Sequence, residues 1–134
     1  EFRRVLFRSG MRHVCLSRHS VHAWSPRVLR AGMGAHFMLS IHEGCDLVAL
    51  AHAFDGRVIA LSGRATTSLF TTDVTGRTAF VFGNEGAGLS PALSAAAHVV
   101  AAIPMPGGTE SMNVAAAAAV CLFERVRQCA AARQ

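Results

Sequence analysis

Two polar stretches punctuated by glycine hold the residue types best suited to chemistry. The first, GNEGAGLS at residues 83–90, follows the apolar run AFVF at 79–82. The second, PGGTESMN at residues 106–113, follows the apolar run HVVAAIPM at 98–105. Glycines allow the backbone to approach a flat ligand closely, and the polar residues stand where the chain leaves runs typical of buried strands. The pattern predicts a binding site made of two loops.

The composition of these loops limits the ligands they could hold. GNEGAGLS fits neither GxGxxG nor GxxxxGK[ST], and the chain contains no lysine, which excludes a Walker-type phosphate clamp. Ile103, Met105 and Met112 are apolar enough to hold a purine. A helix start near Ser111 and Asn113 would favour a carboxylate or phosphate. A nucleoside with a cationic centre and no phosphate, such as S-adenosylmethionine, fits this set.

A purely structural interpretation stays open for both loops. Glycine-rich turns between a strand and a helix are common, so GNEGAGLS could be a plain turn. Ser111 could be the N-cap of the helix that follows. Since a helix needs only one cap, this interpretation accounts less well for Asn113.

The order of apolar runs predicts the elements that position the loops. We expect strands at 11–17, 37–41, 57–61, 79–82 and 98–105. We expect helices at 25–37, at 46–54, from Ser90-Pro91, and from Ser111 to about Ala132, with residues 62–76 mostly loop around one helical turn. Short apolar strands alternating with helices indicate an α/β fold with a mainly parallel sheet. Ligands bind such sheets at the carboxyl ends of the strands, so the loops after Leu61, Phe82 and Met105 should line one site.

Length and composition fit one globular domain. The 134 residues are 51% apolar and 16% charged, which excludes a disordered chain. No apolar run reaches about 18 residues and no signal peptide is recognised, so we expect a soluble, cytoplasmic protein. The four cysteines form no CxxC, which favours free thiols, and the histidines lack the spacing of a metal site.

The charge of the chain is a weak guide to its partner. A formal net charge of +5 is compatible with nucleic acid but does not demand it. The opening segment EFRRVLFRS, residues 1–9, contributes +2 of this charge and is expected to be a non-native scar. We therefore predict one domain over residues 10–134.

The two loops together resemble a known family. FVFGNEGAGLS and IPMPGGTESMNVAAAAAVCLFERVRQ, at this spacing, resemble the second and third motifs of the SpoU/TrmH RNA ribose methyltransferases, within the knotted SPOUT class. WSPRVLRAGMGAHF at 24–37 resembles the segment between the first and second motifs, so the resemblance covers roughly residues 12–128. It implies a C-terminal trefoil knot, a homodimer, bound S-adenosylmethionine, and methyl transfer to a ribose 2′-hydroxyl of tRNA or rRNA.

The same resemblance implies roles for individual residues. The residues expected to form the catalytic pocket are Glu85, Ser111 and Asn113. Those expected to contact the cofactor are Leu61, Ser62, Gly83, Asn84, Gly86, Ile103, Met105 and Met112. The third motif usually reads Ser-Leu-Asn, and here it reads Ser-Met-Asn, a change that conserves volume.

One departure from the family pattern affects the expected activity. The first motif, an asparagine followed by an arginine that helps to activate the 2′-hydroxyl, has no counterpart. Arg18 and Arg30 do not stand in its context. We therefore expect a domain without its first strand–helix unit, and a catalytically impaired cofactor- or RNA-binding dimeric module remains an alternative. A dehydrogenase-like nucleotide-binding domain is a further alternative, but its GxGxxG and ribose-binding acid are absent.

Overall fold

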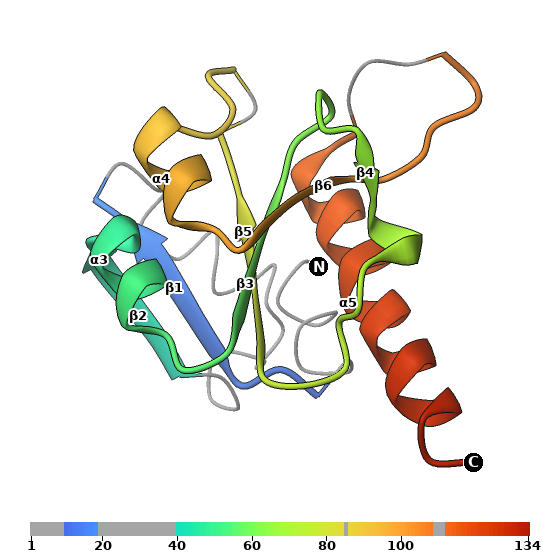
Figure 1. Cartoon of the computed structure of the whole chain (residues 1–134). Coiled ribbons are helices and arrows are strands. Elements are labelled where there is room, and N and C mark those ends of the chain that lie inside the picture. The colour runs from blue at the N-terminus through green and yellow to red at the C-terminus, as the bar shows by residue number, and fades with distance from the viewer. Residues whose placement is uncertain (1–9, 19–39, 85, 109–111) are drawn as a thin grey trace, which may run out of the picture.

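The computed structural model describes residues 10–18, 40–84, 86–108 and 112–134 (Figure 1). In chain order the elements are β1 (His13–Ser17), β2 (Ser40–Cys45), α3 (Leu47–Ala53), β3 (Arg57–Leu61), β4 (Thr67–Ser68), the 3-10 helix η2 (Leu69–Thr71), β5 (Thr78–Phe82), α4 (Pro91–Ala96), β6 (Val99–Ala102) and α5 (Val114–Ala131). Among the described residues, no helix combines the length and apolarity that a membrane crossing requires.

The main sheet has four parallel strands in the order β4-β6-β3-β5, and β1 and β2 form a separate parallel pair. The central strand β3 has the sequence RVIAL, and Val58, Ile59 and Ala60 are almost completely buried. A continuous apolar run is typical of a strand covered on both faces. The predicted α/β fold with a parallel sheet is confirmed.

Two short helices begin where the sequence predicts them. The carboxylate of Asp46 accepts a hydrogen bond from the Ala49 N–H at 3.1 Å, which caps α3. The hydroxyl of Ser90 accepts one from the Leu93 N–H at 3.2 Å, and Pro91 occupies the first turn of α4. Such caps satisfy N–H groups that have no partner within the helix.

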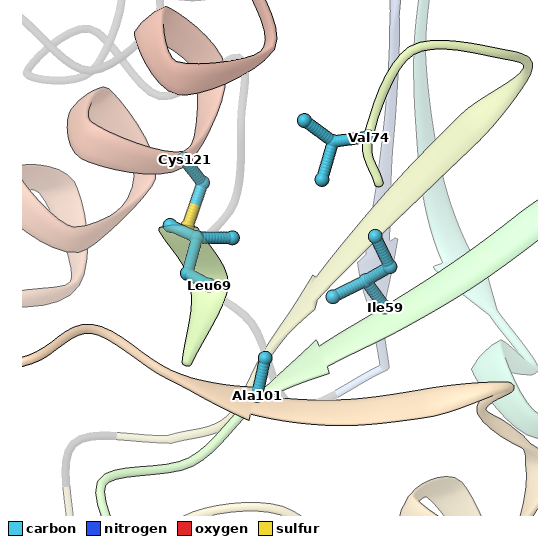
Figure 2. Packing of buried hydrophobic residues seen from close by; sticks show 5 residues of the cluster. All are labelled: Ile59, Leu69, Val74, Ala101 and Cys121. Carbon is cyan, nitrogen blue, oxygen red and sulfur yellow. The ribbon is translucent and has the colours of Figure 1, made fainter. Parts of the chain in front are cut away.

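The two faces of β3 pack against different helices. Ile59 lies in a fully buried cluster with Leu69, Val74, Ala101 and Cys121, which joins the sheet to α5 (Figure 2). Val58 belongs to another cluster, together with residues of α3 and α4. Since successive strand residues point to opposite faces, α5 covers one face of the sheet, and α3 and α4 cover the other.

The four cysteines are free thiols. Cys121 is fully buried, and its desolvation raises the pKa of the thiol to about 12.

Several predicted boundaries were wrong. The strand expected at 37–41 is β2, Ser40–Cys45, whose mostly exposed polar sequence SIHEGC gives no apolar signal. The strand expected at 98–105 ends at Ala102, because its last ladder pair is Ser68↔Ala102 with β4. β4 was not predicted, since its two residues form a strand only by pairing with β6. The helix expected at 25–37 lies outside the described residues.

Candidate active site

The candidate site begins where three neighbouring strands of the sheet end side by side. Leu61 is paired with Phe82 of β5 and with Ala101 of β6. Because the three strands are parallel, the loops that follow them leave from the same edge, the upper side of the view in Figure 1. The structure therefore brings the predicted residues Ser62, Gly83 and Ile103 to one edge of the sheet, which we call the carboxyl edge.

The loop after β5 closes on itself. The Asn84 N–H donates to the Gly88 carbonyl at 3.2 Å, and the Gly88 N–H donates to the Asn84 carbonyl at 2.8 Å. A Cβ at Gly83 would lie only 2.5 Å from the Gly88 carbonyl oxygen and 2.6 Å from the Leu89 nitrogen, so residue 83 has to be glycine. Gly88 has a φ of +67°, which also favours glycine. The exposed Asn84 and Gly86 form the outside of this turn, and Glu85 lies outside the described residues.

The loop after β3 uses its first polar groups locally. The Ser62 N–H donates to the Ala101 carbonyl at 2.9 Å, which fastens the end of β3 to β6. The Ser62 hydroxyl accepts from the Arg64 N–H at 3.3 Å. Leu61 and Ile103 both pack against the buried cluster of Figure 2 and stay partly exposed. Only part of each of these side chains can therefore face a ligand.

The third loop leads into the start of α5. The Met105 carbonyl accepts a hydrogen bond from the Gly108 N–H at 3.3 Å, which forms a tight turn. The side-chain oxygen of Asn113 accepts from the N–H groups of Ala115 at 2.8 Å and Ala116 at 3.4 Å. The expected helix start at Ser111 was wrong, because α5 begins at Val114. The structural alternative named Ser111 as the cap and fitted Asn113 less well, but the N-cap is Asn113. Ser111 itself lies outside the described residues.

Contacts along α5 fix its direction relative to the sheet. The Gln128 side chain bonds to the backbone of Thr72 and Val74, in the segment that precedes β5. One to two turns earlier, Cys121 lies in the middle of the core. Asn113 is fifteen positions before Gln128, about 22 Å along the helix axis. The N-terminus of α5 therefore points toward the carboxyl edge.

The donor set at the carboxyl edge suits a nucleoside without a polyphosphate. Four partly buried apolar residues border the loops: Leu61, Ile103, Met105 and Met112. Arg64 is the one basic residue in the sequence of these loops, and the remaining polar groups are mostly backbone. In the part of the chain that is described, no three His, Cys, Asp or Glu side chains form a metal-binding group.

Comparison with known proteins decides the family. The sequence model of the SpoU rRNA Methylase family matches residues 3–123, nearly the whole chain. This chain belongs to the SpoU rRNA Methylase family. The match begins inside the segment predicted to be non-native, and the origin of that segment stays a prediction.

Individual SpoU relatives agree with this assignment. A 23S rRNA (guanosine-2′-O-)-methyltransferase, RlmB of Xylella fastidiosa strain 9a5c, is 48% identical over 71 residues, 53% of this chain and 28% of the relative. An uncharacterised tRNA/rRNA methyltransferase of Synechocystis, slr1673, is 36% identical over 124 residues, 90% of this chain and 45% of the relative.

Solved SpoU structures share the fold. AviRb from Streptomyces viridochromogenes, in complex with the cofactor AdoMet, superposes with a TM-score of 0.85 at 26% identity, over 97% of this chain and 55% of AviRb. A putative TrmH-family RNA methyltransferase from Porphyromonas gingivalis gives a TM-score of 0.86 at 30% identity, over 95% of this chain and 53% of that protein. The present chain thus spans half or less of the curated relatives named above and about half of these solved structures.

Hydrogen bonds between distant segments add contacts to this SpoU site that sequence reasoning missed. The carbonyl of Ala101, which fastens Ser62 at the site, and the side chain of Gln128, which fastens α5 at the opposite edge of the sheet, were not singled out. No local pattern marks either residue, because their partners lie 39 and 54 positions away in the chain.

Proposed function

We propose that this chain carries the S-adenosylmethionine-binding loops of an RNA methyltransferase that acts on a ribose 2′-hydroxyl of tRNA or rRNA. The main support for the proposal is the pairing of Leu61 with Phe82 and Ala101, because it makes the loops of the second and third motifs leave the sheet side by side. The RlmB relative is described as a guanosine-2′-O-methyltransferase, and the AviRb structure holds AdoMet. Both support the same chemistry for this chain.

The chain would contribute mainly positioning. S-adenosylmethionine, when bound, supplies an electrophilic methyl group. Leu61, Ile103 and Met112 would hold the adenine, and the backbone around Gly83 would approach the ligand closely. Asn113 keeps the first turn of α5 ordered through its cap. Holding a hydroxyl in line with the methyl group and helping its proton to leave would account for the rate.

The second part of this proposal concerns the polar residues of the pocket and the ribose 2′-hydroxyl. Glu85, Ser111 and Asn113 would orient the ribose 2′-hydroxyl, and Glu85 is the carboxylate within the second motif. The Asn113 cap occupies its side-chain oxygen, so its amide N–H₂ is the group that would face the substrate.

The family resemblance also leads us to propose a C-terminal trefoil knot. Support comes from α5, which returns to the segment 72–76 and bonds to it across 49 to 56 positions of sequence. Pulling the chain by both termini should test this. A knotted chain would extend to less than its full contour length of about 3.5 Å per residue, and a full-length extension would contradict the knot.

A cytoplasmic homodimer is the third part of the proposal. Phe123 and Val126 lie one turn apart on α5, with 47% and 38% of their surfaces exposed. Apolar side chains gathered on a helix face suit burial against a second copy. Sedimentation should show a dimer that Phe123→Glu converts to a monomer, and a monomeric wild-type chain would contradict this part.

The impaired module remains the second candidate, because the first motif is missing from the sequence. Isothermal titration of S-adenosylmethionine, with S-adenosylhomocysteine alongside, tests the binding step in this chain. Micromolar binding without methyl incorporation into RNA would favour the impaired module, whereas binding with incorporation would favour the enzyme. A folded sample that binds neither ligand would contradict the cofactor site.

A further inference from the structure

A concave site lies at the opposite edge of the sheet from the candidate active site. It is a cavity of about 410 Å³, and its lining includes Arg57, Asp73, Thr75, Arg77, Thr78 and His98. Arg57 and Thr78 are the paired first residues of β3 and β5, and His98 directly precedes β6. We call this site the amino-edge cleft. A five-residue strand places it about 16 Å from the loops of the carboxyl edge.

Four backbone carbonyls in the lining of the cleft already accept hydrogen bonds. The Asp73 carbonyl accepts from Arg57 Nη1, and the Arg77 carbonyl accepts from the Arg57 N–H. The Thr75 carbonyl accepts from Arg125 and Cys129. The Gly76 carbonyl accepts from Arg125 and Thr78. These bonds reduce the number of lone pairs that are free to accept from a ligand in the cleft. Hydrogen-bond donors would have to be its main partners.

The one carboxylate of the cleft lining is also satisfied. Asp73 accepts hydrogen bonds from the Thr75 N–H at 2.9 Å and the Thr75 hydroxyl at 2.7 Å. Arg57 forms an ion pair with it at 3.3 Å. The hydrogen bonds from Thr75, followed by the charge of Arg57, hold the pKa of Asp73 below its usual value. Its negative charge is therefore balanced by Arg57.

Two groups of the lining remain available to donate. Arg77 is exposed, and its guanidinium lies 5.9 Å from the centre of the Phe54 ring, a cation–π contact that leaves its N–H groups for other partners. The Nδ1 atom of His98 accepts a hydrogen bond from the Val58 N–H at 3.0 Å. This bond assigns the proton of the neutral ring to Nε2, which makes Nε2 a donor.

The loop that forms one wall of the cleft is held rigidly by α5. Gln128 donates to the Thr72 carbonyl at 3.0 Å and accepts from the Val74 N–H at 3.1 Å. Arg125 donates to the next two carbonyls along the loop, at 3.4 and 3.3 Å. A wall fixed before binding loses little entropy when a ligand arrives.

We propose that the amino-edge cleft binds a phosphodiester of the RNA substrate, with Arg77 as its principal contact. This inference rests on the proposed function for the identity of the RNA. A guanidinium and an N–H donor are the groups that phosphate oxygens require, and here they stand beside four carbonyls that already accept hydrogen bonds. Contacts to phosphates position a nucleic acid without reading its sequence, so the cleft would anchor RNA away from the methylated ribose.

The test measures RNA affinity by fluorescence anisotropy over a range of salt concentrations. The probe is a labelled oligouridylate about 12 nucleotides long, within the usual site size for single strands. Arg77→Ala should weaken binding about fivefold and reduce the slope of log affinity against log salt by about 0.7. Arg77→Lys, which keeps the charge, should retain most of the slope. The matched control is Arg133→Ala in the exposed C-terminal turn, which should stay close to wild type.

The outcomes separate this inference from the proposed function. Equal affinities for Arg77→Ala and Arg133→Ala, in chains shown to be folded by circular dichroism, would overturn the RNA contact. If pyrophosphate shifts the ring signals of His98 in NMR while Arg77→Ala leaves the RNA affinity unchanged, the cleft is a small-anion site and the proposal is also wrong. If Arg77→Ala weakens RNA binding but the wild type binds no S-adenosylmethionine, the cleft stands and the proposed function fails.

Discussion

The two edges of the four-stranded sheet are built by different means. At the carboxyl edge, the loop at 83–88 is closed by hydrogen bonds between Asn84 and Gly88, four positions apart. At the amino edge, the segment 72–76 is held by side chains of α5 that are about fifty positions away. The first kind of loop depends on its own sequence, whereas the second depends on a helix that must already be docked.

This difference separates binding from stability. Changes in the loop at 83–88 should alter the ligand site and leave the core intact, because its described residues are mostly exposed. Changes at the α5 contacts should lower the free energy of unfolding and leave cofactor affinity unchanged in the molecules that remain folded. Substitutions at the two edges should therefore affect ligand affinity and the free energy of unfolding separately.

Gly83→Val should weaken S-adenosylmethionine binding about 10- to 100-fold, as expected for overpacking that costs about 1–3 kcal/mol. The added side chain collides with the backbone of Gly88 and Leu89, so the loop has to open. Titration calorimetry measures the affinity, and circular dichroism should show that the variant remains folded.

The matched control for this substitution is Gly107→Val. An added Cβ at Gly107, in the neighbouring loop, meets no atom within 4 Å. Unchanged affinity in Gly83→Val would remove the loop at 83–88 from the cofactor site.

Gln128→Ala should lower the free energy of unfolding by about 1–3 kcal/mol, because it leaves the Thr72 carbonyl and the Val74 N–H without their partners. Urea denaturation measures this loss, and cofactor affinity should stay at the wild-type value. Gln134→Ala, at the exposed C-terminus, is the control. A loss as small as that of the control would show that these contacts do not hold α5.

Asn113→Ala should lower the free energy of unfolding by about 1 kcal/mol through loss of the cap. It should also reduce methyl transfer far more than cofactor affinity. Asn113→Asp keeps a capping oxygen and should restore stability without restoring transfer, as measured by methyl incorporation into RNA. Full transfer by the Asp variant would assign Asn113 to capping alone.

Acid should destabilise the chain partly through Glu124. Its carboxylate is buried and accepts hydrogen bonds from Arg127 at 2.8 and 2.9 Å and from Gln128 at 2.8 Å. The bonds from Arg127 are the main cause of a pKa below the ordinary 4.5. A lowered pKa in the folded state gives stability that is complete above 4.5 and is lost as the pH falls through the folded value.

Urea midpoints between about pH 6 and pH 3 test this effect. The midpoint of Glu124→Gln should fall less than that of the wild type, and a residual fall should remain because the pKa of Asp73 is lowered as well. Arg127→Ala should also reduce the fall, since it removes the main cause of the lowered pKa of Glu124. Parallel curves for wild type and Glu124→Gln would contradict this role.

Elements with strong local signals were predicted well from sequence. RVIAL is a buried strand over the range expected, and α3 and α4 begin near the predicted positions, where Asp46 and Ser90 cap them. The register of β3 with β5 and β6 brings the predicted loops to one edge, as the parallel-sheet rule required.

The features that could not be predicted from the sequence depend on contacts between distant segments of the chain. The pair Thr67–Ser68 is a strand only because β6 lies beside it, and no two-residue pattern could show that. The choice of Asn113 over Ser111 as N-cap follows from where α5 starts, and both residues are chemically suitable caps. The amino-edge cleft could not be predicted for the same reason, since its lining comes from three separate segments of the chain.

The hydrogen bond between the Val74 amide and the Gln128 side chain gives the molecule a built-in reporter. Val74 is fully buried, and its amide proton is held by a helix side chain instead of a neighbouring strand. Its exchange with deuterated solvent should therefore follow detachment of α5, whereas the amide of Ile59 in the centre of the sheet should exchange only on global unfolding. Comparing the two rates would show whether the C-terminal helix opens as a separate unit.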